Sequence, residues 1–217
     1  PRAFNQNGIE IQAPSMLDKG LTQPKVIAGG IADDGKSFVI HESNDGNVQT
    51  RLEAFAPDGT RLWQRNVANL KFGTLIANSA RVCFVGYVSV TTPIMSTLAC
   101  YASVSGAELN TITLPVLFNV ASRIRFLKNG VLRMAFRTST SLNVVDISND
   151  NVINQFNVPI SNISIVSDIS DTGEMLVYRS SEWLYLSATG AVAFARVLAG
   201  DRYTASTVGR ILEKAER

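Results

Sequence analysis

Few residues in this sequence could carry out catalysis. His41 is the only histidine, and Glu42 follows it directly. A hydrolytic triad requires the histidine beside an activated nucleophile. The chain contains neither a Gly-x-Ser-x-Gly turn nor a Ser-x-x-Lys motif. We therefore expect His41 to be an ordinary, partly exposed histidine.

Carboxylates gather in short groups where turns are expected. Turns favour Asp because its side chain accepts hydrogen bonds from the backbone. A calcium loop needs several oxygen ligands at alternating positions, and Asp168-x-x-Asp171-x-Gly173 supplies too few. We expect turn chemistry and no metal site, although a glycosidase-type carboxylate pair from distant positions stays open as a third hypothesis. The groups are Asp33 with Asp34, Glu42 with Asp45, Asp146 with Asp150, and Asp168 with Asp171.

Arginine supplies 14 of the 20 basic residues, and four arginines lie close together in the chain. By the period of two in a strand, Arg123 and Arg125 share one face, as do Arg133 and Arg137. Two interpretations are open: a binding site for an anion or an acidic protein partner, or salt bridges with turn carboxylates. The chain has no glycine-rich phosphate loop and no aromatic ladder, so we expect no nucleic-acid partner.

The two cysteines, Cys83 and Cys100, fall on consecutive predicted strands. The hairpin between them has its centre midway, so the two residues should face each other on one side of the sheet. We predict a disulfide, with two buried thiols as the alternative. A disulfide is typical of an exported protein, whether periplasmic, secreted or at the cell surface.

A repeat of short turns and strands organises most of the chain. Turns aligned on Gly59, Gly106, Asn151 and Gly190 are spaced by 47, 45 and 39 residues. Periods of this length are typical of propeller blades with four strands each. We predict an all-β fold, a β-propeller of about four four-stranded antiparallel blades that is complete or part of a larger ring. A β-sandwich is the alternative. The predicted blades are 25–68, 69–115, 120–159 and 162–199.

Two segments lie outside the predicted repeat region, 25–199. Segment 1–24 contains one candidate strand, 8–12, which could complete another blade. Segment 200–217 is expected to hold a short C-terminal helix at 204–216, because apolar residues recur there at helical spacing. The chain begins with Pro1, which is expected of a processed product or an excised fragment.

Composition excludes several classes of protein. The 217 residues are 46% hydrophobic and 18% charged, which is unlike a disordered chain. No apolar run reaches the roughly 18 residues of a membrane-spanning helix. The formal charge of +2 does not by itself indicate nucleic-acid binding.

The stretch 52–63, Leu-Glu-Ala-Phe-Ala-Pro-Asp-Gly-Thr-Arg-Leu-Trp, resembles the blade signature of pyrroloquinoline-quinone-type (quinoprotein-like) propellers. Ala56, Gly59 and Trp63 match its small residue, turn glycine and docking tryptophan. The resemblance implies that Trp63 packs between adjacent blades. The other units keep parts of the pattern, with Ala102, Gly106 and Asn110 in the second, Asn154 in the third and Phe194 in the fourth.

Enzymes of that family have eight blades, an acidic catalytic residue, a calcium site and often adjacent cysteines. Because this chain has about four units and no adjacent cysteines, the resemblance implies the non-enzymatic branch, without a cofactor. We expect an interaction module or scaffold in a larger exported or cell-surface assembly. The alternative is a carbohydrate-binding, lectin-like propeller, for which Tyr87, Trp183 and Tyr203 are the aromatic candidates.

We also expect the chain not to form a solitary, complete ring. An open stack leaves the outer faces of its first and last units exposed, with Ile27, Val39, Leu176 and Val177 among the residues affected. Exposed apolar area favours association. We expect another protein, another copy of the chain or further parts of the same protein to cover these faces.

Overall fold

The computed structural model consists of β-strands throughout its described part. It describes residues 3–4, 10–11, 25–42, 50–67, 71–87, 96–114, 122–138, 140–148, 151–180 and 182–197. Eighteen strands form one two-stranded sheet and four four-stranded sheets. In the two-stranded sheet, β1 (Ala3–Phe4) pairs with β2 (Glu10–Ile11).

Each four-stranded sheet is an antiparallel meander of consecutive strands, and we call the sheets blades 1 to 4. Blade 1 contains β3 (Lys25–Ile31), β4 (Ser37–Glu42), β5 (Thr50–Phe55) and β6 (Arg61–Val67). Blade 2 contains β7 (Lys71–Ala77), β8 (Arg81–Tyr87), β9 (Ser96–Ala102) and β10 (Glu108–Leu114). Blade 3 contains β11 (Arg123–Phe126), β12 (Leu132–Arg137), β13 (Leu142–Ser148) and β14 (Asn151–Val158). Blade 4 contains β15 (Ile163–Ile169), β16 (Met175–Arg179), β17 (Glu182–Leu186) and β18 (Val192–Val197).

Tight glycine turns set the hairpins inside the blades. In blade 4, Gly173 and Gly190 have φ values of 99° and 86°, a backbone conformation that a side chain strongly disfavours. Gly173 N–H donates to the Ser170 carbonyl, and Gly190 N–H donates to the Ser187 carbonyl. Each turn thus reverses the chain within a few residues and lets consecutive strands pair.

The blades stack face to face because alternate side chains of every strand point to opposite sides. We call the side of a blade toward the next blade in sequence its forward face, and the opposite side its rear face. Phe38 on the forward face of blade 1 packs in one core cluster with Phe84 on the rear face of blade 2. A second cluster joins blades 2 and 3, and a third joins blades 3 and 4. The core therefore consists of three layers between blades.

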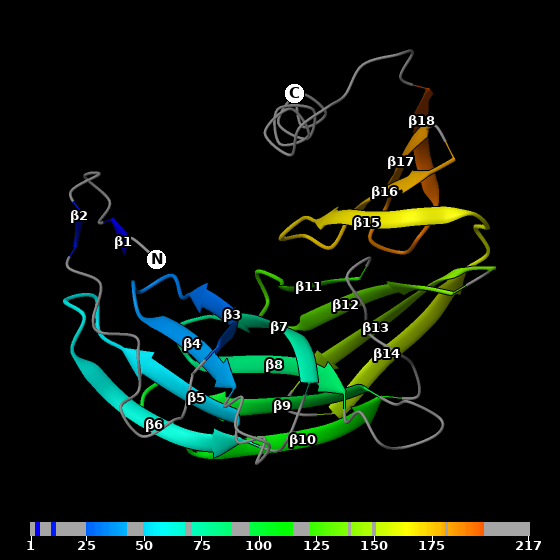
Figure 1. The fold of residues 1–217 in the computed structure, drawn as a ribbon. Coiled ribbons are helices and arrows are strands. Elements are labelled where there is room, and N and C mark those ends of the chain that lie inside the picture. The colour runs from blue at the N-terminus through cyan, green and yellow to red at the C-terminus, as the bar shows by residue number, and fades with distance from the viewer. Residues whose placement is uncertain are drawn as a thin grey trace.

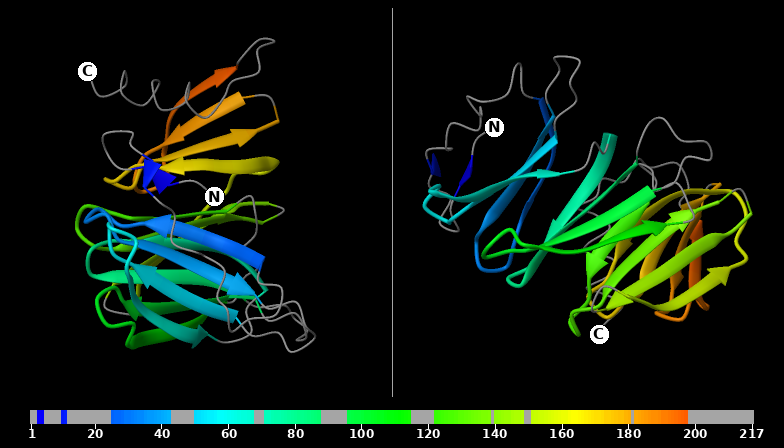
Figure 2. Two further views of the ribbon diagram at one scale, coloured as in Figure 1. Left: turned by 60° about the vertical axis from the view of Figure 1, so that its left-hand side comes forward. Right: turned by 90° about the horizontal axis from the view of Figure 1, so that it is seen from below.

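The first strands of neighbouring blades lie side by side: β3 with β7, β7 with β11, and β11 with β15. The four blades follow one another around an open arc, with blades 1 and 4 at its two ends (Figures 1 and 2). This arrangement is that of a β-propeller, which confirms the predicted fold class and sets aside the β-sandwich. The predicted C-terminal helix at 204–216 lies outside the described residues.

Two sequence expectations about the ends of the stack differ from the structure. Glu10–Ile11, the described part of the predicted strand 8–12, pairs with Ala3–Phe4, and among the described strands this pair joins no blade. Val39, Leu176 and Val177 were expected to be exposed, and all three are buried. Val177 faces blade 3, and the burial of Val39 and Leu176 shows that the outer faces around them are not open to solvent. The side chain of Ile27 lies outside the described part.

Trp63 joins blade 1 to blade 2, in the docking role that the sequence predicts. Its indole Nε1–H donates to the Ser103 carbonyl at 2.9 Å, and its ring lies against Gly106 in the same turn of blade 2. A Cβ atom on Gly106 would lie 2.6 Å from the Trp63 ring, so the glycine allows this close approach. Phe38 contacts the indole from within blade 1, with the ring centroids 6.0 Å apart.

We predict that Trp63→Ala lowers the free energy of unfolding by about 3 kcal/mol, because it leaves a cavity between two blades and an unpaired carbonyl. Urea denaturation measures this change. Trp63→Phe is the control that keeps a ring and removes the hydrogen bond, and it should lose about half as much. An unchanged unfolding midpoint for Trp63→Ala would contradict the docking role.

Candidate interaction surface

One cross-strand position recurs on the forward face of every blade, and each blade fills it differently. In blade 1, Phe38 lies opposite Ala54, which lies opposite Trp63. The register places the corresponding residues of the other blades in the same row across three strands. We call this row the forward layer. Its other members are Cys83, Cys100 and Asn110 in blade 2, Arg133, Asp146 and Asn154 in blade 3, and Leu176, Tyr185 and Phe194 in blade 4.

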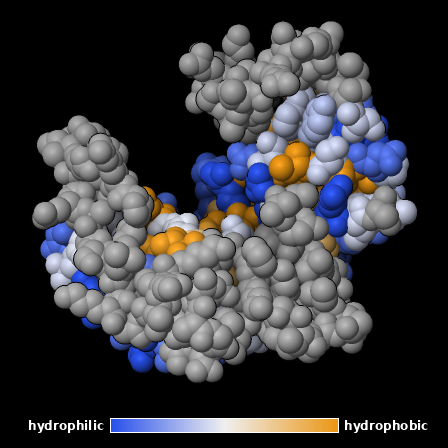
Figure 3. Space-filling model, in the orientation of Figure 1, coloured by the Kyte–Doolittle hydropathy of each residue, from blue (hydrophilic) through white to orange (hydrophobic). Residues whose placement is uncertain are grey.

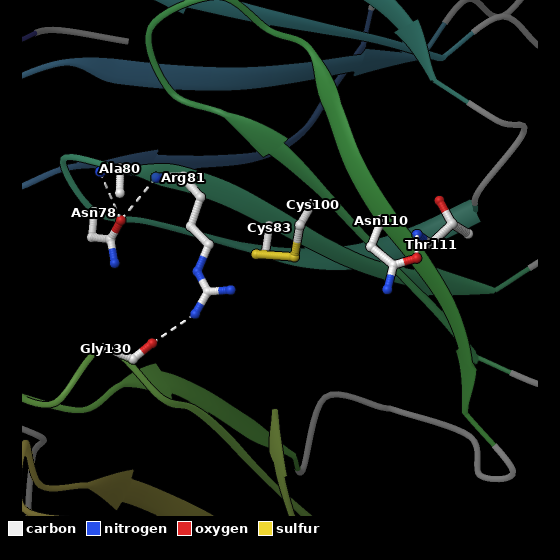
Figure 4. Close-up of a disulfide and its surroundings, with 8 residues drawn as sticks. All are labelled: Asn78, Ala80, Arg81, Cys83, Cys100, Asn110, Thr111 and Gly130. Carbon is white, nitrogen blue, oxygen red and sulfur yellow. Dashed lines mark hydrogen bonds between the residues drawn. A yellow bond between two sulfur atoms is a disulfide. The ribbon is translucent and has the colours of Figure 1, made fainter. Parts of the chain in front are cut away.

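In blade 2 the forward layer is a disulfide between Cys83 and Cys100, as the sequence predicts. The two cysteines pair across β8 and β9 and are buried in the cluster shared with blade 3. Figure 4 shows Arg81 beside them, reaching the turn of blade 3, where its Nη2 donates to the Gly130 carbonyl at 2.6 Å. The guanidinium also lies over the Phe126 ring, 5.1 Å from its centroid. The disulfide and this cation–π contact thus lie at the same junction, between blades 2 and 3.

In blade 3 the forward layer is a buried ion pair. Arg133 donates to both carboxylate oxygens of Asp146 at 2.7 Å, and each residue is at most 6% exposed. The same guanidinium donates to two carbonyls of blade 4, those of Gly173 at 2.6 Å and Ala188 at 2.7 Å. Asn154 Nδ2 also donates to Asp146, at 3.3 Å from the Oδ2 that accepts from Arg133 Nη2. Both charges are therefore paired and hydrogen-bonded, as buried charges require.

All four arginines that the sequence singles out contact blade 4 from blade 3. Arg123 donates to the Ser167 carbonyl at 3.0 Å, and Arg137 donates to the Ile163 carbonyl at 2.8 Å. Arg125 pairs with Asp168 at 3.5 Å, with both side chains more than 40% exposed. Two of the four arginines form salt bridges, but their carboxylates, Asp146 and Asp168, lie on strands and not in turns as the sequence suggested; the other two donate hydrogen bonds to backbone carbonyls. Burial removes Arg133 from any exposed surface, and partner binding by Arg123, Arg125 and Arg137 stays a prediction.

The forward face of blade 4 is aromatic, and no described sheet lies beyond it (Figures 1 and 2). Tyr185 and Phe194 stack with their ring centroids 5.1 Å apart and an interplanar angle of 14°. Tyr178 and Trp183, the next pair along the same two central strands, have centroids 5.0 Å apart. Phe194 is 36% exposed, and the other three rings are half-buried. Among the carbohydrate candidates, Trp183 lies here, whereas the side chain of Tyr87 and all of Tyr203 lie outside the described part.

The rear face of blade 1 carries charge where the other blades carry apolar side chains. Glu53 lies on β5, opposite Val39 of β4. The same position is held by Ala99, Val145 and Leu184 in blades 2 to 4. It is buried, and its carboxylate lies 3.2 Å from Arg61 Nη1. The two ends of the arc therefore differ in chemistry, aromatic at blade 4 and charged at blade 1.

His41 lies beside Glu53 on this face and is 1% exposed, so the expectation of a partly exposed histidine is wrong. Glu53 and Val39 on the same face are buried too, so this part of the rear face of blade 1 is not open to solvent. Nε2 is 3.0 Å from a Glu53 oxygen, but neither ring nitrogen makes a well-aligned hydrogen bond to a described residue. Burial lowers the pKa of His41 below its ordinary value, and the Glu53 carboxylate offsets part of this shift.

The described residues contain no group of three or more His, Cys, Asp or Glu side chains that could hold a metal ion. Both buried carboxylates, Glu53 and Asp146, are engaged by cationic or histidine partners.

No described helix is long and apolar enough to cross a membrane. Figure 3 shows mixed hydrophobic and hydrophilic surface in the hollow of the arc.

No family model matches the sequence, and no curated protein matches it. The resemblance of 52–63 to quinoprotein-like blades therefore stays a prediction. Among solved structures, the Dos1 propeller is 12% identical with a TM-score of 0.55, covering 94% of this chain and 54% of that chain. A protein of unknown function from Bacteroides caccae is 13% identical with a TM-score of 0.49, covering 86% of this chain and 65% of that one.

Rhamnogalacturonan lyase YesW is 13% identical with a TM-score of 0.47, covering 89% of this chain and 44% of that one. This chain thus spans less than two thirds of each of these structures. Likeness at such low identity shows the fold alone, a β-propeller.

We predict that Asp146→Asn lowers the free energy of unfolding by about 3–5 kcal/mol, because it leaves the Arg133 charge buried without its counter-charge. Chemical denaturation measures the loss. The matched control is Asp168→Asn, which breaks the exposed pair with Arg125 and should cost less than about 1 kcal/mol. Equal effects of the two substitutions would show that the buried pair has no special role.

We predict that stability falls as the pH decreases below about 6.5, the ordinary pKa of histidine. The unfolded chain takes up a proton on His41 there, while the folded state, whose His41 pKa is lowered, takes it up only at lower pH. Urea midpoints between pH 7.5 and pH 5 measure the slope. His41→Gln should flatten it, and a slope that is the same in this variant would assign the dependence to other groups.

Proposed function

We propose that this chain is a non-enzymatic β-propeller interaction module whose partner-binding surface is the aromatic forward face of blade 4. The observation that carries the proposal is the pair of ring contacts, Tyr185 with Phe194 and Tyr178 with Trp183, on a face that no described blade covers. Aromatic side chains are enriched at the centres of protein interfaces, because they bury much area and lose little rotamer freedom.

The charged groups of the described part support a non-enzymatic role. Asp146 is neutralised by Arg133, and Glu53 lies against His41 and Arg61. Catalytic acids and bases need access to substrate, and these buried carboxylates are instead held in contacts that join strands and blades. The arginine side chains of blade 3 likewise contact backbone carbonyls of blade 4.

The proposed setting is a larger assembly outside the cytosol. The disulfide between Cys83 and Cys100 supports an exported protein, since such bonds persist in oxidising compartments. A scaffold of the non-enzymatic quinoprotein-like kind, as the stretch 52–63 implies, fits this setting. The partner would be a protein or a further copy of the chain.

A carbohydrate-binding module is the second candidate. The observation that favours it is the half-buried Trp183 beside Tyr178, because flat aromatic rings can stack on the apolar faces of sugars. The two candidates differ in which residue matters most. Phe194, the more exposed ring, should dominate a protein interface, and Trp183 should dominate a sugar site.

The test compares charge insertions at two exposed apolar positions. Phe194→Asp places a charge on the aromatic face, whereas Leu109→Asp places one on β10 of blade 2, where the exposed fraction is a similar 46%. Tagged proteins are cross-linked in the source cells, and co-recovered proteins are quantified by mass spectrometry. We expect recovery of the partner to fall at least tenfold for Phe194→Asp and to stay unchanged for Leu109→Asp.

Equal recovery with both variants would overturn the proposed surface. A glycan array run in parallel separates the two candidates: binding that Trp183→Ala abolishes would favour the carbohydrate module. Circular dichroism of each variant establishes that it is folded before its binding is compared.

A further inference from the structure

The chain has 16 asparagines, and one of them begins an acceptor pattern for N-linked sugar. The pattern is Asn-x-Ser/Thr, in which the middle residue is not proline, and Asn162, Ile163 and Ser164 match it. No other asparagine of the sequence has a serine or threonine two positions after it. Because the pattern is only three residues long, its meaning depends on where the fold places it.

The structure places Asn162 on the surface, in the link between blades 3 and 4. β14 ends at Val158 and β15 begins at Ile163, so Asn162 is the last residue before the new blade. In an antiparallel meander of four strands, the first and third hairpins lie at one end, and the links to the adjoining blades lie at the other. A sugar on Asn162 would therefore lie at the opposite end of blade 4 from the turns at Gly173 and Gly190.

The two residues that the modification needs are accessible, and the residue between them is anchored. The side chains of Asn162 and Ser164 are exposed, and neither makes a hydrogen bond to a described residue. Ile163 is 3% exposed in the core cluster between blades 3 and 4, and its carbonyl accepts from Arg137 at 2.8 Å. A sugar on Asn162 would thus displace none of the described contacts that hold the link in place.

The backbone at Asn162 is left-handed, with φ at 58°. Asparagine is one of the few residues with a side chain that tolerate this conformation, because its short amide can bond to nearby backbone. This geometry explains an asparagine at position 162, although its amide makes no such bond here. It places no demand on position 164, which lies in β15. The conformation of the link therefore accounts for Asn162 but not for Ser164.

The disulfide gives an independent indication of the compartment. Cys83 and Cys100 are bonded, and such bonds form in oxidising compartments that include the lumen of the secretory pathway. The Asn-x-Ser/Thr pattern is used on the surface loops of secreted proteins. The bonded cysteines and the exposed tripeptide thus indicate the same route through the cell.

We propose that Asn162 carries an N-linked oligosaccharide, which keeps the link end of blades 3 and 4 facing solvent. In the transfer, the amide nitrogen of Asn162 bonds to the anomeric carbon of a sugar, and the bond from that carbon to a lipid diphosphate breaks. The diphosphate leaves with the bonding electrons, and the amide loses one proton to a base of the transferase. The inference goes beyond the proposed function and shares only its exported setting.

The first experiment is mass spectrometry of the native protein, recovered as the whole chain from the source cells. Peptide-N-glycosidase F in water labelled with heavy oxygen converts each glycosylated asparagine to a labelled aspartate. We expect the label at Asn162 in most molecules and at no other asparagine. An unlabelled Asn162 in the native protein would overturn the inference.

The second experiment secretes variants of the whole chain from cultured eukaryotic cells and compares their mobility on gels before and after removal of sugar. Ser164→Ala should abolish the shift, whereas Ser164→Thr keeps the hydroxyl and should retain it. Asn157→Gln is the matched control, since Asn157 is exposed on β14 but Pro159 stands two positions after it. Ser164→Ala leaves the left-handed residue unchanged, so its effect does not depend on a glutamine folding at position 162.

A shift that persists in Ser164→Ala would also contradict the inference, because the sugar would then lie elsewhere. Failure of this inference and failure of the proposed function are distinguishable. An unmodified native chain that still recovers a partner in a manner sensitive to Phe194→Asp leaves the interaction module standing and removes the glycan. A labelled Asn162 supports the glycan whether or not a partner is recovered.

Discussion

Side chains of a β-strand alternate between two sides, so each four-stranded blade here has two faces to bury, and a single blade cannot bury both. Stacking buries the facing sides of adjacent blades. The three core clusters lie between blades: Phe38 and Phe84 belong to the first, Cys100 and Met134 to the second, and Val144 and Val177 to the third. The stability of any one blade therefore depends on its neighbours.

In the forward layer, different side chains meet the same geometric requirement in different blades. The row must fill the space under the turns of the next blade and must satisfy their carbonyls. Trp63 does both, with a ring and one N–H, and Arg133 does both with a charge that Asp146 neutralises. The disulfide of blade 2 fills its place without hydrogen bonding, and Arg81 reaches the carbonyl of Gly130 beside it. Packing is conserved between blades although the residues are not.

The ends of the arc have different chemistry, and this difference limits how they can be covered. The rings around Phe194 present an uncharged surface that favours burial against apolar groups or a guanidinium. The rear face of blade 1 holds Glu53 with His41 and Arg61, and the first two are almost fully buried within this chain.

The sequence by itself determined the four meanders and the cysteine pair. Turn spacing and strand alternation are local properties, and the register of a short hairpin follows from its length, which is why Cys83 could be placed opposite Cys100. The same arithmetic would have placed Arg133 opposite Asp146, since the two lie 13 residues apart on consecutive strands. The buried pair is thus encoded locally, by the length of the hairpin that joins its two strands.

Only the tertiary structure decided what lies on each face. Arg133 donates to carbonyls 40 and 55 residues away, and His41 is buried although Glu42 follows it directly. Such contacts depend on how one sheet docks on the next, which is a long-range packing choice that no local pattern encodes. Alternation predicts that a strand has two faces. It does not say which blade covers each face, nor which face, like that around Phe194, no described blade covers.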